Sequence, residues 1–161
     1  MPEKEKQHNI FLSLGSNLGD RGENLDRALS YIEERIGDII TTSAFYVTDP
    51  VGFKSDNQFL NAVCKIRTKK QPLEILKITQ NIEKEMGRKI KSTDKIYTDR
   101  IIDIDLLLFD DEILKTPKLE LPHPHLHERL FVLLPLSEIA GDMIHPTLHQ
   151  TIRQLKENIE G

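Results

Sequence analysis

Two aspartates, Asp103 and Asp105, give the clearest chemical signal in this sequence. They interrupt an apolar run that extends from Ile101 to Phe109. Residues two apart on a strand share a face, with α-carbons about 6.5 Å apart, so both carboxylates point the same way. Desolvating an unpaired carboxylate is costly, and a hard cation offsets that cost. The pair therefore predicts a site for two Mg²⁺ ions of the kind that clamps a phosphoryl transfer. The alternative is a solvent-facing alternation at the end of a strand.

Basic side chains surround the aspartate pair in the sequence. Arg88 and Arg100 precede it, and Lys118 and Arg129 follow it. Guanidinium groups bind phosphate oxygens through paired hydrogen bonds, which makes these arginines candidate phosphate ligands. Taken singly, each of these residues is more typical of a solvated surface charge.

Three histidines alternate in the run His123-Pro124-His125-Leu126-His127. Histidine is a common zinc ligand, and a zinc hydrolase is one interpretation of this run. However, no cysteine or HExxH helix accompanies it, and Pro124 opposes regular structure. The pattern favours a histidine that donates a hydrogen bond to phosphate.

The segment from Gly15 to Gly19 is not one of the common nucleotide-binding loops. No Gly-Lys-Ser/Thr follows it, and it does not fit the Gly-x-Gly-x-x-Gly pattern. The signature set of the protein kinases is also missing. We interpret the segment as a strand-to-helix turn, so nucleotide chemistry must use another site.

Hydrophobic periodicity predicts the elements that position these residues. Apolar and β-branched runs predict strands at 9–14, 39–47, 59–68 and 101–109, with short β structure near Ile113 and Leu119. Helical spacing predicts helices at 21–36, capped by Asp20, from Pro72 to Gly87, at 131–140 and at 148–159. The order strand–helix–strand–strand–helix–strand is that of the ferredoxin-like α+β fold, an antiparallel sheet with helices packed on it.

Length and charge narrow the class of protein. The chain of 161 residues suits one domain, spanning 1–161, that buries a core without disulfides. With 22 basic against 26 acidic residues, its net charge of -4 argues against a general nucleic-acid binder. No apolar run approaches the roughly 20 residues of a membrane helix, and the charged residues 1–8 do not fit a signal peptide. The lone Cys64 is expected to be buried, and a chain without a disulfide fits a reducing cytoplasm.

Three motifs occur together and in order: Leu14-Gly15-Ser16-Asn17-Leu18-Gly19-Asp20, then Arg100-Ile101-Ile102-Asp103-Ile104-Asp105, then Leu121-Pro122-His123 with Arg129 and Phe131. They resemble the 6-hydroxymethyl-7,8-dihydropterin pyrophosphokinase family over nearly the whole chain. The resemblance implies a ferredoxin-like fold and a monomeric cytoplasmic enzyme of folate synthesis. Such an enzyme transfers the β,γ-pyrophosphoryl unit of ATP to the pterin's hydroxymethyl oxygen and releases AMP.

The resemblance also implies roles for individual residues. The catalytic set is Arg88, Arg100, Asp103 and Asp105, and the two aspartates hold two Mg²⁺ ions. The ATP-binding set is Gln80, Glu83, Arg88, Arg100, Leu106, Lys118, His123 and Arg129. The pterin-binding set is Thr48, Asp49, Val51, Phe59, Asn61, Tyr97 and Phe131.

Simple physical chemistry supports the pterin set independently of the family. A flat heterocycle is held well between two aromatic faces, here Phe59 and Phe131, and the amide of Asn61 offers a donor and acceptors to its edge. Taken alone, both phenylalanines are more typical of an ordinary core.

Residues 88–100 combine several charges with few large apolar side chains, and this composition predicts a lid that orders over bound ligands. Family members often carry a basic residue, an aromatic, Gly and Pro before the arginine. This chain has Ile96-Tyr97-Thr98-Asp99 instead, so Tyr97 takes the aromatic position.

No histidine or glutamate is clearly placed as a base, so catalysis is expected to rest on positioning and charge neutralisation, with Asp103 able to orient the hydroxyl or accept its proton. Besides the zinc hydrolase, a non-catalytic ferredoxin-like module that binds a small molecule or RNA stays open. Such a module would not need the two aspartates.

Overall fold

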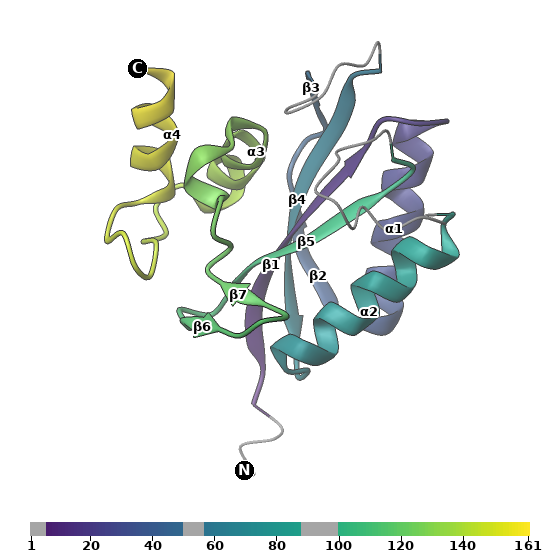
Figure 1. Cartoon of the computed structure of the whole chain (residues 1–161), viewed down its shortest axis with the longest axis horizontal. Coiled ribbons are helices and arrows are strands. Elements are labelled where there is room, and N and C mark those ends of the chain that lie inside the picture. Colours follow the sequence, from purple (N-terminus) through teal and green to yellow (C-terminus); the bar gives the residue numbers. More distant parts are fainter. Residues whose placement is uncertain (1–5, 50–56, 88–99) are drawn as a thin grey trace.

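The computed structural model describes residues 6–49, 57–87 and 100–161. Its centre is a five-stranded antiparallel sheet with the strand order β2-β4-β1-β5, in which β3 also pairs with β4 (Figure 1). The strands are β1 (His8–Ser16), β2 (Asp38–Thr42), β3 (Tyr46–Thr48), β4 (Phe59–Thr68) and β5 (Asp103–Phe109). This order confirms the predicted ferredoxin-like sheet.

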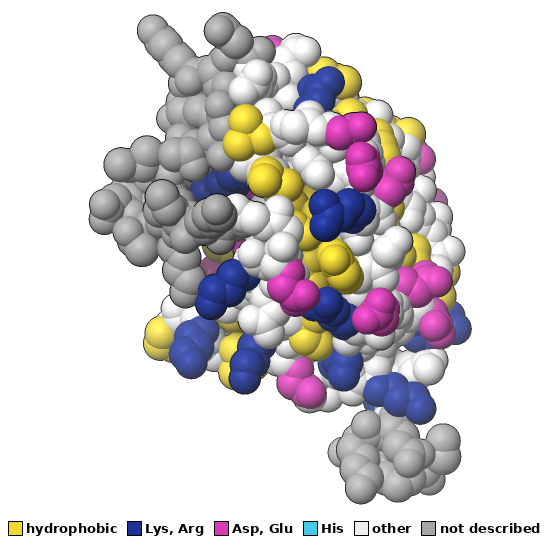
Figure 2. Space-filling view, turned by 90° about the vertical axis from the view of Figure 1, so that its right-hand side faces the viewer, with side chains coloured by type: hydrophobic (Ala, Val, Ile, Leu, Met, Phe, Trp, Pro, Cys, Tyr) yellow, Lys and Arg dark blue, Asp and Glu magenta, His cyan; other side chains and the backbone are white. Residues whose placement is uncertain are grey.

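Helices cover both faces of the sheet (Figure 1). On one face lie α1 (Arg21–Arg35) and α2 (Pro72–Glu85). On the other face lie α3 (Leu130–Ala140) and α4 (Ile152–Glu160), which follow a short hairpin of β6 (Leu114–Lys115) and β7 (Glu120–Leu121) and a 3₁₀ turn, η2 (Leu126–Glu128). Acidic and basic side chains are interspersed on the outward side of α1 and α2 (Figure 2), as expected for solvated helix faces. No helix within the described ranges is long and apolar enough to cross a membrane.

Side chains at the helix starts explain where α1 and α4 begin. The carboxylate of Asp20 accepts a hydrogen bond from the backbone N–H of Glu23 at 3.1 Å, which caps α1 as predicted. Thr151 and Gln154 form a reciprocal capping box at the start of α4. The last helix therefore begins at Ile152 and not near 148, because the preceding residues turn around the imidazole of His145, which accepts from the N–H groups of Thr147 and Leu148.

The predicted strand at 39–47 is divided into β2 and β3. Ser43 bonds to Val63 through both its backbone and its hydroxyl oxygen. The next N–H, that of Ala44, donates to the carboxylate of Glu138 on α3 and not to a neighbouring strand. The ladder is interrupted there, which a pattern of β-branched residues could not reveal.

Alternation along the strands separates a core from a functional face. The core between the sheet and α1 and α2 takes alternate residues such as Leu12, Leu14 and Cys64. Cys64 is fully buried as predicted, and burial raises the pKa of its thiol to about 12. The opposite face carries a second cluster around Phe11 and Val63, packed against α3 and α4. Beyond that cluster the same face carries the polar residues Asn61, Asp103 and Asp105, and we call it the functional face.

Candidate active site

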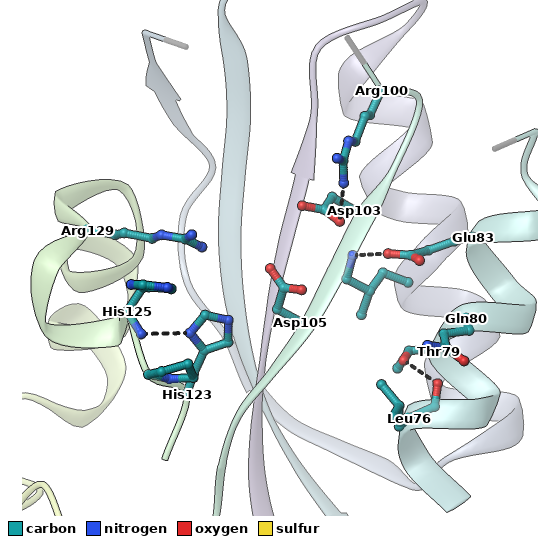
Figure 3. Close-up of a pocket in the computed structure, with 12 residues that line it drawn as sticks. Leu76, Thr79, Gln80, Glu83, Arg100, Asp103, Asp105, His123, His125 and Arg129 are labelled. Atoms are coloured by element: carbon teal, nitrogen blue, oxygen red, sulfur yellow. Dashed lines mark hydrogen bonds and ion pairs between the residues drawn. The ribbon is translucent and has the colours of Figure 1, made fainter. Parts of the chain in front are cut away.

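A cavity of about 340 Å³ lies between β5, α2 and the segment that leads into α3 (Figure 3). Its volume is in the range of small-molecule sites. Seven of the residues singled out from the sequence line it: Gln80, Glu83, Arg100, Asp103, Asp105, His123 and Arg129. Residues as far apart in the sequence as Gln80 and Arg129 are thus brought together around one space.

Strand register places the two aspartates on the functional face of β5. Asp103 lies opposite Gly15 of β1, and Asp105 lies opposite Ser13. Both carboxylates line the cavity, and Asp105 points towards the side from which His123 and Arg129 enter (Figure 3). The guanidinium of Arg100 donates to Asp103 at 3.2 Å. A guanidinium that could bind phosphate and a carboxylate that could bind a metal ion are therefore held side by side.

Glu83 ties α2 to the backbone between the two aspartates. Its side chain is buried, and its carboxylate accepts a hydrogen bond from the N–H of Ile104 at 2.7 Å (Figure 3). Among the described strands β5 pairs only with β1, so this N–H faces away from the ladder. Glu83 thereby satisfies an edge-strand donor and fixes the peptide that carries Asp103 and Asp105.

The imidazole of His123 is held neutral and in one tautomer. Burial, followed by the nearby charges of Arg129 and His125, lowers its pKa to about 4, against the opposing effect of Asp103. Its Nδ1 accepts from the backbone N–H of His125 at 3.1 Å, so the proton of the neutral ring is on Nε2. His123 is also anchored to β5, because its own N–H donates to the carbonyl of Leu107 at 2.9 Å. Its Nε2–H is a fixed donor that an anionic ligand can use.

The predicted pterin residues of β3 and β4 lie on the same face as the aspartates. Gly15 of β1 pairs with Asp103 on one side and Asn61 on the other, and neighbouring strands are about 4.8 Å apart. Asn61 is buried, and its amide oxygen accepts from the hydroxyl of Thr48. A Cβ added at Gly15 would lie 2.9 Å from Nδ2 of Asn61 and 3.5 Å from the ring of Phe59. Gly15 thus keeps space for these two side chains, a role that the sequence did not reveal.

Phe131 stands in the first turn of α3, next to Arg129. The guanidinium carbon of Arg129 lies 5.7 Å from the centre of the Phe131 ring, a cation–π distance. Phe131 is partly buried against the second core cluster, which agrees in part with its interpretation as a core residue. Arg129 lines the cavity, so the start of α3 carries a cavity residue next to Phe131, which the family resemblance implies is a pterin-binding residue.

The remaining predicted residues lie elsewhere. The side chain of Leu106 is buried in the core between the sheet and helices α1 and α2, and Lys118 is exposed between β6 and β7. Neither residue lines the cavity. Asp49 is exposed and accepts from the amide of Gln58 at 2.9 Å. Arg88, Val51 and Tyr97, and the predicted lid apart from Arg100, lie outside the described residues.

Asn17 is a positioning residue. The sequence predicts only that it lies in a strand-to-helix turn. Its N–H donates to the carbonyl of Arg100 at 2.9 Å, and its amide oxygen accepts from the N–H of Arg100 at 2.6 Å. Its amide nitrogen donates to the carbonyl of Asn57 at 3.2 Å. The backbone that carries the Arg100 guanidinium is therefore fixed on both sides.

The donor set at the cavity fits magnesium better than zinc. Within the described part of the chain, no three His, Cys, Asp or Glu side chains group into a metal site by themselves. The imidazole of His125 is engaged by Glu128 at 3.0 Å, and that of His123 by a backbone N–H. Mg²⁺ is commonly held by one or two carboxylates together with substrate phosphates and water, and Asp103 and Asp105 supply that number of carboxylates.

Comparison with known proteins gives one consistent result. Residues 11–141 match the 7,8-dihydro-6-hydroxymethylpterin-pyrophosphokinase (HPPK) family. The chain is 49% identical over 138 residues to a 2-amino-4-hydroxy-6-hydroxymethyldihydropteridine pyrophosphokinase of Porphyromonas gingivalis, covering 85% of this chain and 93% of that one. A protein of the same name from Bacillus subtilis is 42% identical over 131 residues, covering 81% and 77%.

Larger proteins also match. The folic acid synthesis protein FOL1 of Dictyostelium discoideum is 40% identical over 150 residues, which are 93% of this chain but 22% of that protein. Among solved structures, HPPK-DHPS of Plasmodium falciparum superposes with a TM-score of 0.78 at 19% identity, covering 98% of this chain. This chain spans 46% of that solved chain, and the likeness supports the fold.

Proposed function

Because this chain belongs to the 7,8-dihydro-6-hydroxymethylpterin-pyrophosphokinase family, we propose that it transfers pyrophosphate from ATP to 6-hydroxymethyl-7,8-dihydropterin, a step of folate biosynthesis. The products are the pterin diphosphate and AMP. The observation that carries the proposal is a cavity that brings together paired carboxylates and candidate phosphate-binding donors, beside a sheet face that also carries the buried Asn61.

The cavity is the site of the phosphates. Asp103 and Asp105 would hold two Mg²⁺ ions, which would neutralise phosphate charge and polarise the phosphorus centre. Arg100, Arg129 and the neutral Nε2–H of His123 bind phosphate oxygens, together with Arg88. Gln80 lies on the nucleotide side, and Glu83 acts through Ile104 to fix the aspartates.

The pterin lies across the polar end of the same face. Asn61, oriented by Thr48, reads the amide-like edge of the ring, and Phe59 and Phe131 contact its faces. Gly15, which pairs with Asn61 on one side and Asp103 on the other and has no Cβ beside Asn61, lets the pterin's hydroxymethyl group approach the carboxylates.

The reaction is a displacement at the β-phosphorus. The pterin hydroxyl oxygen forms a bond to that phosphorus, the bond to the oxygen bridging the α- and β-phosphates breaks, and AMP leaves with that electron pair. The hydroxyl proton passes to water, directly or through Asp103. Because this chain supplies mainly fixed donors and carboxylates, the rate acceleration comes from orientation and charge stabilisation.

We also propose that residues 1–161 form one pyrophosphokinase domain that acts as a monomer in the cytoplasm, without nucleic-acid or membrane partners. The separate Porphyromonas gingivalis protein, of which this chain covers 93%, supports action as a single unit.

Product analysis tests this function directly. The purified chain is incubated with ATP, Mg²⁺ and 6-hydroxymethyl-7,8-dihydropterin, and the products are identified by mass spectrometry. We expect equimolar AMP and pterin diphosphate. Formation of ADP would indicate an ordinary kinase, and the absence of any pterin product would refute the proposal.

A further inference from the structure

The two sides of the pterin pocket come from elements that are far apart in the sequence. Thr48, Phe59 and Asn61 belong to β3 and β4, and Phe131 belongs to α3. α3 packs against both strands on the functional face (Figure 1). Its apolar anchors Val132, Leu133 and Leu136 are buried in the second core cluster. Hydrophobic burial is not directional, so these anchors hold the helix on the sheet without fixing its distance from β3.

A polar contact joins α3 to β3 and to the residue two positions before that strand. The carboxylate of Glu138 accepts a hydrogen bond from the hydroxyl of Tyr46 at 2.5 Å, and both of its oxygens lie 3.1 Å from the N–H of Ala44. Residues 46 and 138 are 92 positions apart. Hydrogen bonds are directional, so this contact sets the spacing that apolar packing leaves open.

Both ends of this contact are aligned with pterin-pocket residues. Tyr46 pairs with Asn61 across β3 and β4, so their side chains share the functional face. Glu138 follows Phe131 by seven residues, which is close to two helical turns, so the two lie on the same side of α3. Fixing Glu138 to β3 therefore fixes the side of the helix from which Phe131 projects.

We propose that the Tyr46–Glu138 contact, reinforced by the N–H of Ala44, is a positioning device that sets the width of the pterin pocket and so its selectivity for a flat ring. This inference rests on the proposed function. Stacking demands a narrow separation between ring faces, so a small outward shift of α3 costs contact with the pterin. The phenol of Tyr46 is protonated at neutral pH and can donate, and the hydrogen bond to Glu138 raises its pKa further.

Stability alone does not explain the contact. Glu138 is exposed and Tyr46 is half-buried, and exposed polar contacts of this kind contribute little to the free energy of unfolding. A purely structural role would therefore be nearly silent when the contact is removed. A positioning role would instead appear in the affinity for one substrate and not for the other.

Three variants and a control test the proposal. Glu138→Ala removes both hydrogen bonds, Tyr46→Phe removes one, and Glu138→Gln keeps an oxygen that can accept both. Glu157→Ala removes an exposed carboxylate from α4 and is the control. The dissociation constant of 6-hydroxymethyl-7,8-dihydropterin is measured by calorimetry with Mg²⁺ and α,β-methylene-ATP, whose bridging carbon blocks transfer. The affinity for the analogue alone, the KM of each substrate and the thermal midpoint are also measured.

We expect Glu138→Ala to raise the pterin dissociation constant and KM about three- to tenfold, as for a lost hydrogen bond. The analogue affinity of every variant, and the pterin affinity of Glu138→Gln and of the control, should stay within about twofold of the original protein. Tyr46→Phe should raise the pterin dissociation constant by an intermediate factor. If Glu138→Ala does not fold, the pterin affinity of Tyr46→Phe tests the proposal in its place.

Two results would overturn the inference while leaving the proposed function intact: normal pterin binding by Glu138→Ala, or equal losses for pterin and nucleotide. Failure of Glu138→Gln to rescue binding would assign the effect to charge and would also contradict it. If the original protein neither binds the pterin nor forms its diphosphate, the proposed function itself fails, and the inference fails with it.

Discussion

The proposed phosphate side and the proposed pterin side of this site are held together in different ways. On the phosphate side, backbone groups do most of the positioning: Glu83 binds the N–H of Ile104, His123 is anchored to Leu107, and Asn17 binds both backbone groups of Arg100. On the pterin side, β3 pairs with β4 through the backbone, but α3 meets these strands through side chains, with Glu138 as the polar link. Hydrogen bonds to backbone groups thus fix the geometry of the phosphate side, whereas the geometry of the pterin side depends on how α3 docks on the sheet.

This difference suits the two substrates. A triphosphate needs charges at fixed positions, because electrostatic stabilisation depends on donors that do not reorganise during the reaction. A flat ring needs mainly a gap of the right width. Changes on the phosphate side should therefore affect turnover most, and changes on the pterin side should affect affinity for one substrate.

The largest effect is expected from the aspartates. Asp103→Ala and Asp105→Ala should each reduce kcat by at least about a hundredfold, because fixed charges at a reacting centre contribute on that scale. The fold should persist, since both side chains are only partly buried. Steady-state assays at saturating Mg²⁺, with thermal melting, measure both. The control is Asp111→Ala in the exposed turn after β5, and near-normal turnover of either variant would remove these residues from the metal site.

The next effect concerns the rigidity of the phosphate side. Glu83→Ala leaves the buried N–H of Ile104 without its acceptor, which costs about 1–3 kcal/mol of unfolding free energy, and kcat should fall as β5 loosens. Glu85→Ala, on the same helix, is a matched control, because it removes only an exposed pair with Arg35. Chemical denaturation and kcat are the measurements. If both variants behave alike, the positioning role of Glu83 is wrong.

A smaller and more selective effect is expected on the pterin side. Phe131→Ala should raise the pterin dissociation constant about tenfold, from lost stacking and buried area, and should leave nucleotide affinity nearly unchanged. Calorimetry with each ligand separately decides this. Equal losses for both ligands would show that Phe131 serves the packing of α3 and not the pocket, and the contrast between the two sides would then disappear.

The same contrast explains how much could be predicted from the sequence. Period-two alternation was enough to place Asp103 and Asp105 on one strand face, and the predicted elements gave the ferredoxin-like order. The contact between Tyr46 and Glu138 left no local signal, because it depends on how α3 docks on β3. The break between β2 and β3 escaped for the same reason, since the N–H of Ala44 is bound by that distant carboxylate. The family resemblance implies that Leu106 belongs to the ATP-binding set, but alternation along β5 directs its side chain into the core.

The last prediction concerns pH and separates the two sides once more. Burial lowers the pKa of His123 to about 4, so from its ordinary value of 6.5 down to about 4 the unfolded chain binds a proton that the folded chain does not. This residue's contribution to stability is therefore lost as the pH falls through that window, by roughly 1–2 kcal/mol at pH 5. His123→Gln should flatten the dependence of unfolding free energy on pH, whereas His125→Gln, which removes only one of the charges that lower this pKa, should flatten it less. A bound triphosphate favours the protonated ring, so nucleotide binding below pH 6 should take up a proton, detectable by calorimetry in buffers of different ionisation enthalpy. Pterin binding in the presence of the nucleotide analogue should not take up this proton, and equal uptake for both ligands would place His123 outside the phosphate site.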